Sequence, residues 1–219
     1  MIKKNIKFSI AIDGSSASGK TTGSKFISRK FKFNLLSSGM LYRYLSYKII
    51  KNGNKYTKKF IVNQSQKITL KKLDNKKLYN PEVTKYSSII SKKLYVRKAL
   101  KSFQKKFIKK YKLVIVEGRD IGSIIMPNAD LKLFFTCSNK EKAKRRLKEF
   151  QNQNKKISLI QVKKALIQRD KEDTKRKISP LIMAKNSVLV DTTKLTKKQM
   201  EAKLINLVRR SISKKYGDI

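Results

Sequence analysis

The sequence contains no histidine, no tryptophan and a single cysteine, Cys137. One thiol cannot close a disulfide within the chain, and without histidine the usual ligands of a zinc site are missing. A disulfide framework and a cysteine- or histidine-ligated zinc site are therefore excluded within one chain. We expect a protein of a reducing compartment, the cytoplasm.

Long apolar runs are also missing. None approaches the roughly 18 residues that a membrane span requires, and a hydrophobic content of 39% fits a soluble protein. Met1-Ile2-Lys3-Lys4 leads into a short β-like run ending at Asp13-Gly14, without the apolar region and cleavage site of a secretion signal. We expect no membrane partner and no export, and 219 residues suit one domain.

Acidic residues are scarce, because 14 of them face 56 basic residues, for a net charge of +42. Such a charge suggests either nucleic-acid binding or a solvated basic surface. Only ten basic residues are arginine and the other 46 are lysine, spread through every segment. We therefore favour a lysine-rich surface and expect no specific nucleic acid. Arginine alone offers a planar fork that matches phosphate oxygens, so the positions that keep it are informative.

Short β-branched or aromatic runs alternate with longer helical patterns, which is typical of a parallel sheet covered by helices. The expected fold class is α/β, with a five-stranded parallel sheet flanked by helices. Strands are predicted at residues 6–12, 33–36, 113–117, 131–136 and 188–191. Helices are predicted at residues 20–29, 40–51, 81–110, 140–149, 159–171 and 196–214. Residues 52–80 are interpreted as a polar insertion with a short alternating piece at 67–73, and residues 152–156 as a turn between helices.

The strongest motif fits the pattern G-x-x-x-x-G-K-[ST] between a predicted strand and a predicted helix. Its residues are Gly14, Ser15, Ser16, Ala17, Ser18, Gly19, Lys20 and Thr21. Glycines permit a tight loop whose N–H groups point at phosphate oxygens, and the following helix adds its positive end. Lys20 would reach the β- and γ-phosphates, and Thr21 would give its hydroxyl to Mg²⁺. The motif predicts binding of a nucleoside triphosphate.

Arginines recur at predicted loop ends, where a second phosphate group could be held. Arg43 follows a Ser-Ser-Gly turn, Arg97 lies in a predicted helix, and Arg119 with Asp120 follows the third strand. Asp120 could hold a ribose hydroxyl. A further group would share one helix face if the helix persists to residue 177: Arg169, Asp173 and Arg176. Its alternative interpretation is a surface ion pair. Glu117, Asp120, Asp170 and Asp173 take four of the 14 acids.

At this point the sequence resembles the bacterial cytidylate kinases, within the nucleoside monophosphate kinases of the P-loop class. The resemblance covers nearly the whole chain. It rests on Ile12-Asp13-Gly14 before the phosphate loop, and on residues 35–43, 117–122, 127–131, 169–176 and 179–181. It implies a core at 1–36, 111–144 and 177–219, a monophosphate-binding region with insertion at 37–110, and a lid at 145–176.

The resemblance implies transfer of the γ-phosphoryl group of ATP to CMP, and also to dCMP, with Mg²⁺. For the donor we predict contacts from the phosphate loop, Thr22 and Arg145. For the acceptor we predict Ser38, Tyr42, Arg43, Ser88, Arg97, Arg119, Asp120, Arg169, Asp173 and Arg176. Ser88 and Asp173 would address cytosine, while Asp120 and Arg169 would contact ribose or link the lid to the substrate. Lys20, Arg119 and Arg176 are the predicted catalytic residues, and the expected state is a monomer.

Two positions depart from the family pattern: Ser37 stands where Asp is usual, and Lys175 where Asn is usual. Glu117 is interpreted either as support for the Mg²⁺ waters or as a helix cap or ion pair with Arg119. UMP, AMP and shikimate remain alternative acceptors, separated from CMP chiefly by Ser88 and Asp173. A basic nucleic-acid-binding protein is the alternative of a different class.

Overall fold

The structure is a computed structural model that describes residues 6–152 and 157–217. Contacts divide the chain into two compact units. Unit 1 comprises residues 1–35 and 112–219, and unit 2 comprises residues 36–111. The predicted turn at 152–156 lies, except for Asn152, outside the described residues.

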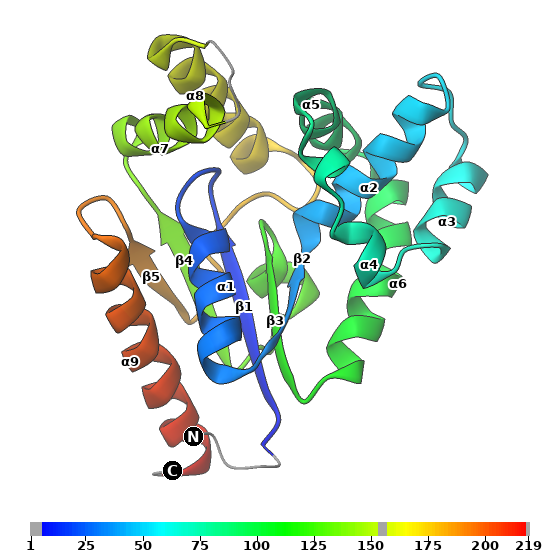
Figure 1. Cartoon of the computed structure of the whole chain (residues 1–219). Helices are drawn as coiled ribbons and strands as arrows, with labels where there is room; N and C mark the ends of the chain where they lie inside the picture. Colours follow the sequence, from blue (N-terminus) through cyan, green and yellow to red (C-terminus); the bar gives the residue numbers. More distant parts are fainter. Residues whose placement is uncertain (1–5, 153–156, 218–219) are drawn as a thin grey trace. The chain divides into compact units, whose positions relative to one another are not determined.

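A five-stranded parallel sheet forms the scaffold of unit 1, as predicted (Figure 1). Its strands are β1 Phe8–Gly14, β2 Asn34–Ser37, β3 Leu113–Gly118, β4 Leu131–Thr136 and β5 Ser187–Asp191, in the order β2-β3-β1-β4-β5, and β2 runs across the boundary between the units. The central strand β1 pairs in parallel with β3 on one side and β4 on the other. The chain first moves from β1 toward one edge and later toward the other, so the carboxyl end of β1 is a point where ligands bind in such sheets.

Two helices cover one face of this sheet, α1 Lys20–Phe31 and α9 Lys197–Tyr216 (Figure 1). These helices and the sheet share one hydrophobic core. Phe8, Ile10, Ile12 and Phe135 of the sheet are buried there with Ile27 of α1 and a stripe of α9. That stripe consists of Met200, Leu204, Val208 and Ile212, spaced four residues apart. Burial of these side chains fixes the start of α1, and with it the phosphate loop, against the end of β1.

The remaining helices of unit 1 are α7 Asn139–Gln151 and α8 Leu159–Lys175, with a π-helical turn η2 at Ile121–Ile125. Helices α7 and α8 pack together through Ala143, Val162 and Leu166. A capping box at Ser158 precedes α8. The Ser158 hydroxyl accepts from the N–H of Gln161, and the Gln161 side chain accepts from the N–H of Ser158.

Unit 2 is helical: α2 Ser38–Lys51, α3 Lys58–Gln66, α4 Leu70–Leu73, η1 Lys76–Tyr79, α5 Pro81–Ile90 and α6 Leu94–Lys110. The single helix predicted over 81–110 is wrong, because α5 ends at Ile90 and the backbone is extended at Lys93 (φ −90°, ψ 120°), just before α6 begins. The buried stripe changes phase there: the i, i+4 pattern from Ile90 would bury Leu94, but Leu94 is 48% exposed and Val96 is fully buried. The stretch interpreted as an insertion, residues 52–80, contains three short helical elements, and part of its alternating piece forms α4.

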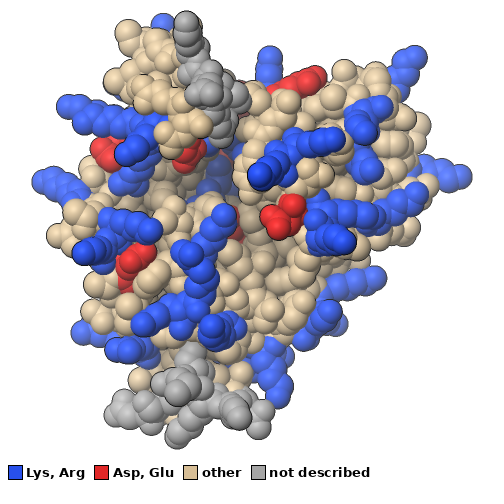
Figure 2. All heavy atoms as spheres, viewed as in Figure 1, with Lys and Arg blue, Asp and Glu red and all other residues tan. Residues whose placement is uncertain are grey.

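Basic side chains are spread over the face seen in Figure 2, with acidic ones scattered among them. Within the described residues, no helix is long and apolar enough to cross a membrane.

Candidate functional site

The phosphate loop connects the end of β1 to the first residue of α1. Gly19 adopts the left-handed conformation (φ 86°) before Lys20 begins the helix, a conformation that costs glycine nothing. A Cβ on Gly14 would lie 2.4 Å from the carbonyl oxygen of Phe135, so only glycine lets β1 pass β4 this closely. The loop therefore turns directly into a helix N-terminus, which is the arrangement that binds phosphate groups.

Lys20 lies over this loop, with Nζ 3.4 Å from the carbonyl oxygen of Ser15. Burial, followed by the positive charge of Arg119, lowers the pKa of Lys20 to about 7. Glu117 acts in the opposite direction, and Arg169 and Asp173 also contribute. The ammonium thus sits among other cations in a site that favours its neutral form until an anion arrives.

Thr21 and Glu117 meet at the start of α1. The Thr21 hydroxyl donates to Oε1 of Glu117 at 3.1 Å, and the Ser24 hydroxyl donates to Oε2 at 3.3 Å. Glu117 is buried, at the end of β3 beside the phosphate loop. A threonine hydroxyl backed by a buried carboxylate is a hard-oxygen donor set, which suits Mg²⁺.

Arg119, Asp173 and Arg176 form an ion-pair cluster in unit 1. Arg119 Nε lies 2.8 Å from Asp173 Oδ2, and Arg176 Nη1 lies 3.3 Å from Asp173 Oδ1. Burial alone would raise the pKa of Asp173, but Arg119, with Arg169 and Arg176, holds this pKa below its usual value. The alternative of an exposed surface pair does not apply, because these side chains are largely buried. Since Arg119, Arg169 and Asp173 all act on the pKa of Lys20, the cluster adjoins the phosphate loop.

Asp13, the last residue before the phosphate loop's first glycine, positions the segment after β3. Its Oδ1 accepts from the N–H of Ile121 at 2.8 Å and its Oδ2 from the N–H of Gly122 at 2.7 Å. Burial raises the pKa of Asp13 to about 6, although these two hydrogen bonds favour the charged form. Asp120, which is buried and has partners of its own, lies between Arg119 and this clamp.

Arg145 reaches the loop from α7. Its Nη1 donates to the Thr192 hydroxyl at 2.9 Å and its Nη2 to the Thr192 carbonyl oxygen at 2.8 Å. The Thr192 hydroxyl in turn donates to the carbonyl oxygen of Ser18 in the loop. Thr22, also predicted to contact the donor, is exposed on α1.

Unit 2 holds the other predicted acceptor residues. The Arg97 guanidinium lies over the ring of Tyr42, 5.5 Å from its centroid, and Arg97 Nη1 donates to the carbonyl oxygen of Ser91. Arg43 lies over Tyr79 in the same way, at 5.3 Å. Ser38 is buried in the first turn of α2, one turn before Tyr42 and on the same face. Ser88 is half-buried in α5, which packs against α2.

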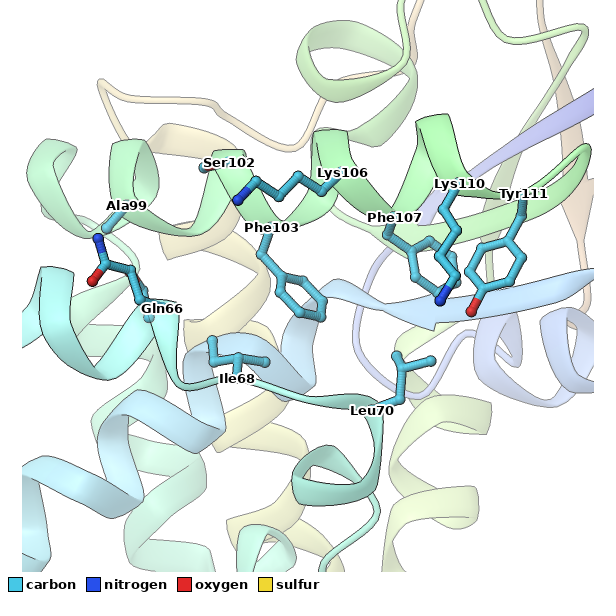
Figure 3. Close-up of a pocket in the computed structure, with 11 residues that line it drawn as sticks. Gln66, Ile68, Leu70, Ala99, Ser102, Phe103, Lys106, Phe107, Lys110 and Tyr111 are labelled. Atoms are coloured by element: carbon cyan, nitrogen blue, oxygen red, sulfur yellow. The ribbon is translucent and has the colours of Figure 1, made fainter.

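A pocket of about 330 Å³ lies elsewhere in unit 2, between α6 and residues 65–70 (Figure 3). Phe103 points from α6 toward Ile68, and Lys106 and Lys110 lie along the same helix. None of the predicted site residues lines this pocket, so it is separate from the residues described above.

Sequence reasoning missed several residues that the structure places at the loop. Asp13 is part of a family motif in the sequence, and Asp170 is a scarce acid within another, but neither has a predicted role, and Lys142 and Thr192 are not singled out at all. Asp170 Oδ1 accepts from the Ser16 N–H at 3.2 Å, and Asp170 forms an ion pair with the buried Lys142. The rarity of acids and the family motif at 169–176 could have indicated Asp170, but nothing in the pattern distinguishes Lys142 from the other 45 lysines.

A parallel sheet with a phosphate loop at the end of its central strand, and a basic cluster beside that loop, defines a P-loop nucleotide-binding protein. The profile described as cytidylate kinase matches residues 10–210. A cytidylate kinase of Mycoplasmoides gallisepticum is 34% identical over 95% of this chain and 96% of its own, and one of Thermosipho africanus is 36% identical over 91% and 93%. The chain therefore belongs to the cytidylate kinase family, as the sequence predicted, and is an enzyme.

Solved structures support the fold alone. A crystal structure of an uncharacterised protein from Eubacterium ventriosum is similar with a TM-score of 0.54 and 12% identity, and covers 91% of this chain and 97% of its own. A protein from Thermus thermophilus follows with a TM-score of 0.50 and 16% identity, covering 93% and 98%.

Proposed function

We propose that this protein transfers the γ-phosphoryl group of ATP to CMP and dCMP, giving ADP with CDP or dCDP, in pyrimidine nucleotide metabolism. Membership of the cytidylate kinase family supports the acceptor class. The observation that carries the proposal is the cluster beside the phosphate loop, where Arg119 and Arg176 share Asp173, and Arg119 and Asp173 in turn act on Lys20. Two polyphosphate groups repel each other, and a fixed set of cations is what can hold them close enough to react.

Each cation has a proposed part in the reaction. Lys20 holds the β- and γ-phosphate oxygens of ATP, while Arg119 and Arg176 neutralise charge on the transferred group and on the acceptor phosphate. The acceptor is already an oxyanion, so the reaction needs no general base, and the lack of histidine does not impede it. Positioning and charge stabilisation carry this chemistry through its loose, metaphosphate-like transition state.

Thr21 fits a role as the protein's Mg²⁺ ligand. Magnesium in such enzymes takes one or two protein ligands together with phosphate oxygens and waters, and the described residues contain no group of three acidic or sulfur ligands that would hold a metal by themselves. The Thr21 hydroxyl would supply one ligand, and the Glu117 carboxylate that now accepts from it would then accept from the ion's waters. Held there, Mg²⁺ would offset the negative charge that develops during transfer.

Residues of unit 2 are proposed for the acceptor nucleotide. Ser38, Tyr42, Arg43 and Arg97 would hold its phosphate, with Arg97 kept in place by stacking on Tyr42 and by its hydrogen bond to Ser91. Ser88 and Asp173 would recognise cytosine, and Asp120 and Arg169 the ribose. Residues 145–176 would serve as a lid that keeps water from the γ-phosphate, with Arg145 and Thr22 on the donor side. We further propose a cytoplasmic monomer.

The test is a coupled assay of ADP formation with Mg²⁺-ATP and a panel of acceptors: CMP, dCMP, UMP, AMP and shikimate. We expect CMP and dCMP to give the highest kcat/KM. The Lys20→Ala and Arg176→Ala variants should each lower kcat by about 100-fold or more, as loss of a group that stabilises transition-state charge does, while the circular dichroism spectrum stays native. Unchanged CMP turnover in either variant would contradict the proposal, and a preference for another acceptor would correct it.

A further inference from the structure

Helices α7 and α8 contact the phosphate loop through a buried ion pair outside the proposed catalytic set. Lys142 is only 5% exposed, in a chain where lysine otherwise covers the surface. Its ammonium pairs with Oδ2 of Asp170 on α8. The other carboxylate oxygen, Oδ1, accepts from the backbone N–H of Ser16 in the loop at 3.2 Å. One carboxylate thus joins two helices and the loop.

Two further contacts join the loop to the same pair of helices. Arg146 of α7 donates from Nη2 to the Ser16 hydroxyl at 3.3 Å. Ala17, held in the left-handed conformation at φ 58°, packs against the apolar cluster of Ala143, Val162 and Leu166. A non-glycine residue with positive φ is held there by its surroundings. The α7–α8 pair is therefore what holds residues 16 and 17 in place.

A carboxylate at this position poses an electrostatic problem, since the loop is built to receive a triphosphate. An uncompensated negative charge within hydrogen-bonding distance of the loop backbone would repel that ligand. Lys142 offsets this repulsion, because its ammonium neutralises the Asp170 carboxylate at a site where solvent screens charges little. Conversely, a lysine this deeply buried needs the carboxylate, since an unpaired buried charge is costly.

We propose that Asp170 and Lys142 are positioning residues for the donor nucleotide: Asp170 fixes the Ser16 N–H and so the shape of the phosphate loop, and Lys142 cancels the charge that Asp170 brings to it. The inference rests on the proposed function in taking ATP as the donor. Neither side chain touches the reacting phosphates, and each acts through the loop. Loss of either residue therefore weakens ATP binding while the chemical step and the acceptor site are retained.

Three variants test this proposal through the dissociation constant for ATP, measured by titration calorimetry, and through kcat and the two KM values. Lys142→Met leaves a bare carboxylate beside the loop, and we expect ATP affinity to fall by about tenfold or more. Asp170→Ala removes the acceptor of the Ser16 N–H and should have a similar effect. The double variant Lys142→Met/Asp170→Asn carries no charge but keeps an oxygen for the Ser16 N–H, so its ATP affinity should recover to within about threefold of the unmodified protein. KM for CMP should stay within about twofold throughout.

The matched control is Lys197→Met/Glu201→Gln, which removes the i, i+4 pair at 4.0 Å on α9 between the exposed Lys197 and the half-buried Glu201 and should leave every parameter unchanged. Thermal unfolding of each variant separates loss of fold from loss of affinity. Unchanged ATP affinity in folded Asp170→Ala overturns the inference, and so does a double variant that binds ATP more weakly than Lys142→Met. Failure of the unmodified protein to bind ATP would instead refute the proposed function.

Discussion

Raising the pH from 7 to 9 should weaken ATP binding by this protein, because Lys20 must carry a proton to attract the triphosphate. In the free protein, burial and the neighbouring Arg119 lower the pKa of Lys20 to about 7. A bound polyphosphate reverses the balance by placing several negative charges beside the ammonium, and so raises this pKa. Binding is therefore linked to uptake of a proton at neutral and alkaline pH.

The size of the effect follows from the fraction of Lys20 that is charged before ATP arrives. With a pKa near 7, about half is charged at pH 7, about a tenth at pH 8 and about a hundredth at pH 9. Since apparent affinity scales with the binding-competent fraction, the dissociation constant should rise by about 50-fold between pH 7 and 9. Lys20 as a residue keeps some contact with solvent, so this factor is an upper value. The phosphates contribute little to this change, because their last proton is lost near pH 6.

Titration calorimetry in buffers of different ionisation enthalpy measures both quantities. At pH 8 we expect about 0.9 proton taken up per ATP bound, and at pH 6 about 0.1. The Lys20→Arg variant, whose guanidinium stays charged, should show no change of affinity over this range. The variant Lys25→Arg, on the exposed face of α1, should keep the pH dependence of the unmodified protein. A dissociation constant that stays constant from pH 7 to 9, with no proton uptake, would refute the claim that burial holds Lys20 near neutrality.

Three more outcomes follow from individual contacts. In urea unfolding, the stability difference between Asp13→Asn and the unmodified protein should shift by about 2 kcal/mol in favour of the variant as the pH rises from 4 to 7. The reason is that the pKa of Asp13 is raised to about 6, so its ionisation in this window costs the folded state; a difference independent of pH would contradict this. Gly23→Ala should lower stability by about 1 kcal/mol, since its Cβ would lie 2.8 Å from the buried Phe135 ring, whereas Gly39→Ala, with no atom within 4 Å, should not; equal melting temperatures would exclude the clash. Arg176→Lys should lose most CMP turnover despite its charge, because one ammonium cannot replace the contacts to Asp173 and Ser179; full activity would show that the planar fork is not needed.

Much of the fold could be predicted from the sequence because its signals are local. The strand at 131–136 was predicted with the bounds of β4, and α1 begins at Lys20 as the motif indicated. Prediction failed where local pattern and packing disagreed. Residues 81–110 have the composition of one helix, but α5 ends at Ile90 and the chain turns before α6, so that Val96 is buried and Leu94 is not. Short helices in the polar stretch at 58–79 lack a strong apolar stripe, and the threonine and asparagine residues that cap them are also common in loops.

For the candidate site, too, the sequence predicted the residues and the tertiary structure gave the contacts between them. The phosphate loop, the scarce arginines and the order of the family motifs are properties of the sequence, and they determined the family and the list of site residues. Those roles remain predictions that the variants above will test. The sequence could not show which of these residues contact one another. Arg119 and Asp173 are 54 residues apart in the chain, and Ser16 and Asp170 are 154 residues apart.

The sequence alone therefore determined the chemistry that this protein can hold, because a phosphate loop is a short, local pattern with one physical use. Only the tertiary structure decided how that chemistry is tuned. It placed Lys20 near other cations and away from most solvent, and so brought its pKa to about 7. It also placed Asp13 and Asp170, the latter neutralised by Lys142, against backbone N–H groups. The physical reason is that burial and charge proximity depend on distances in space between residues that the sequence keeps far apart.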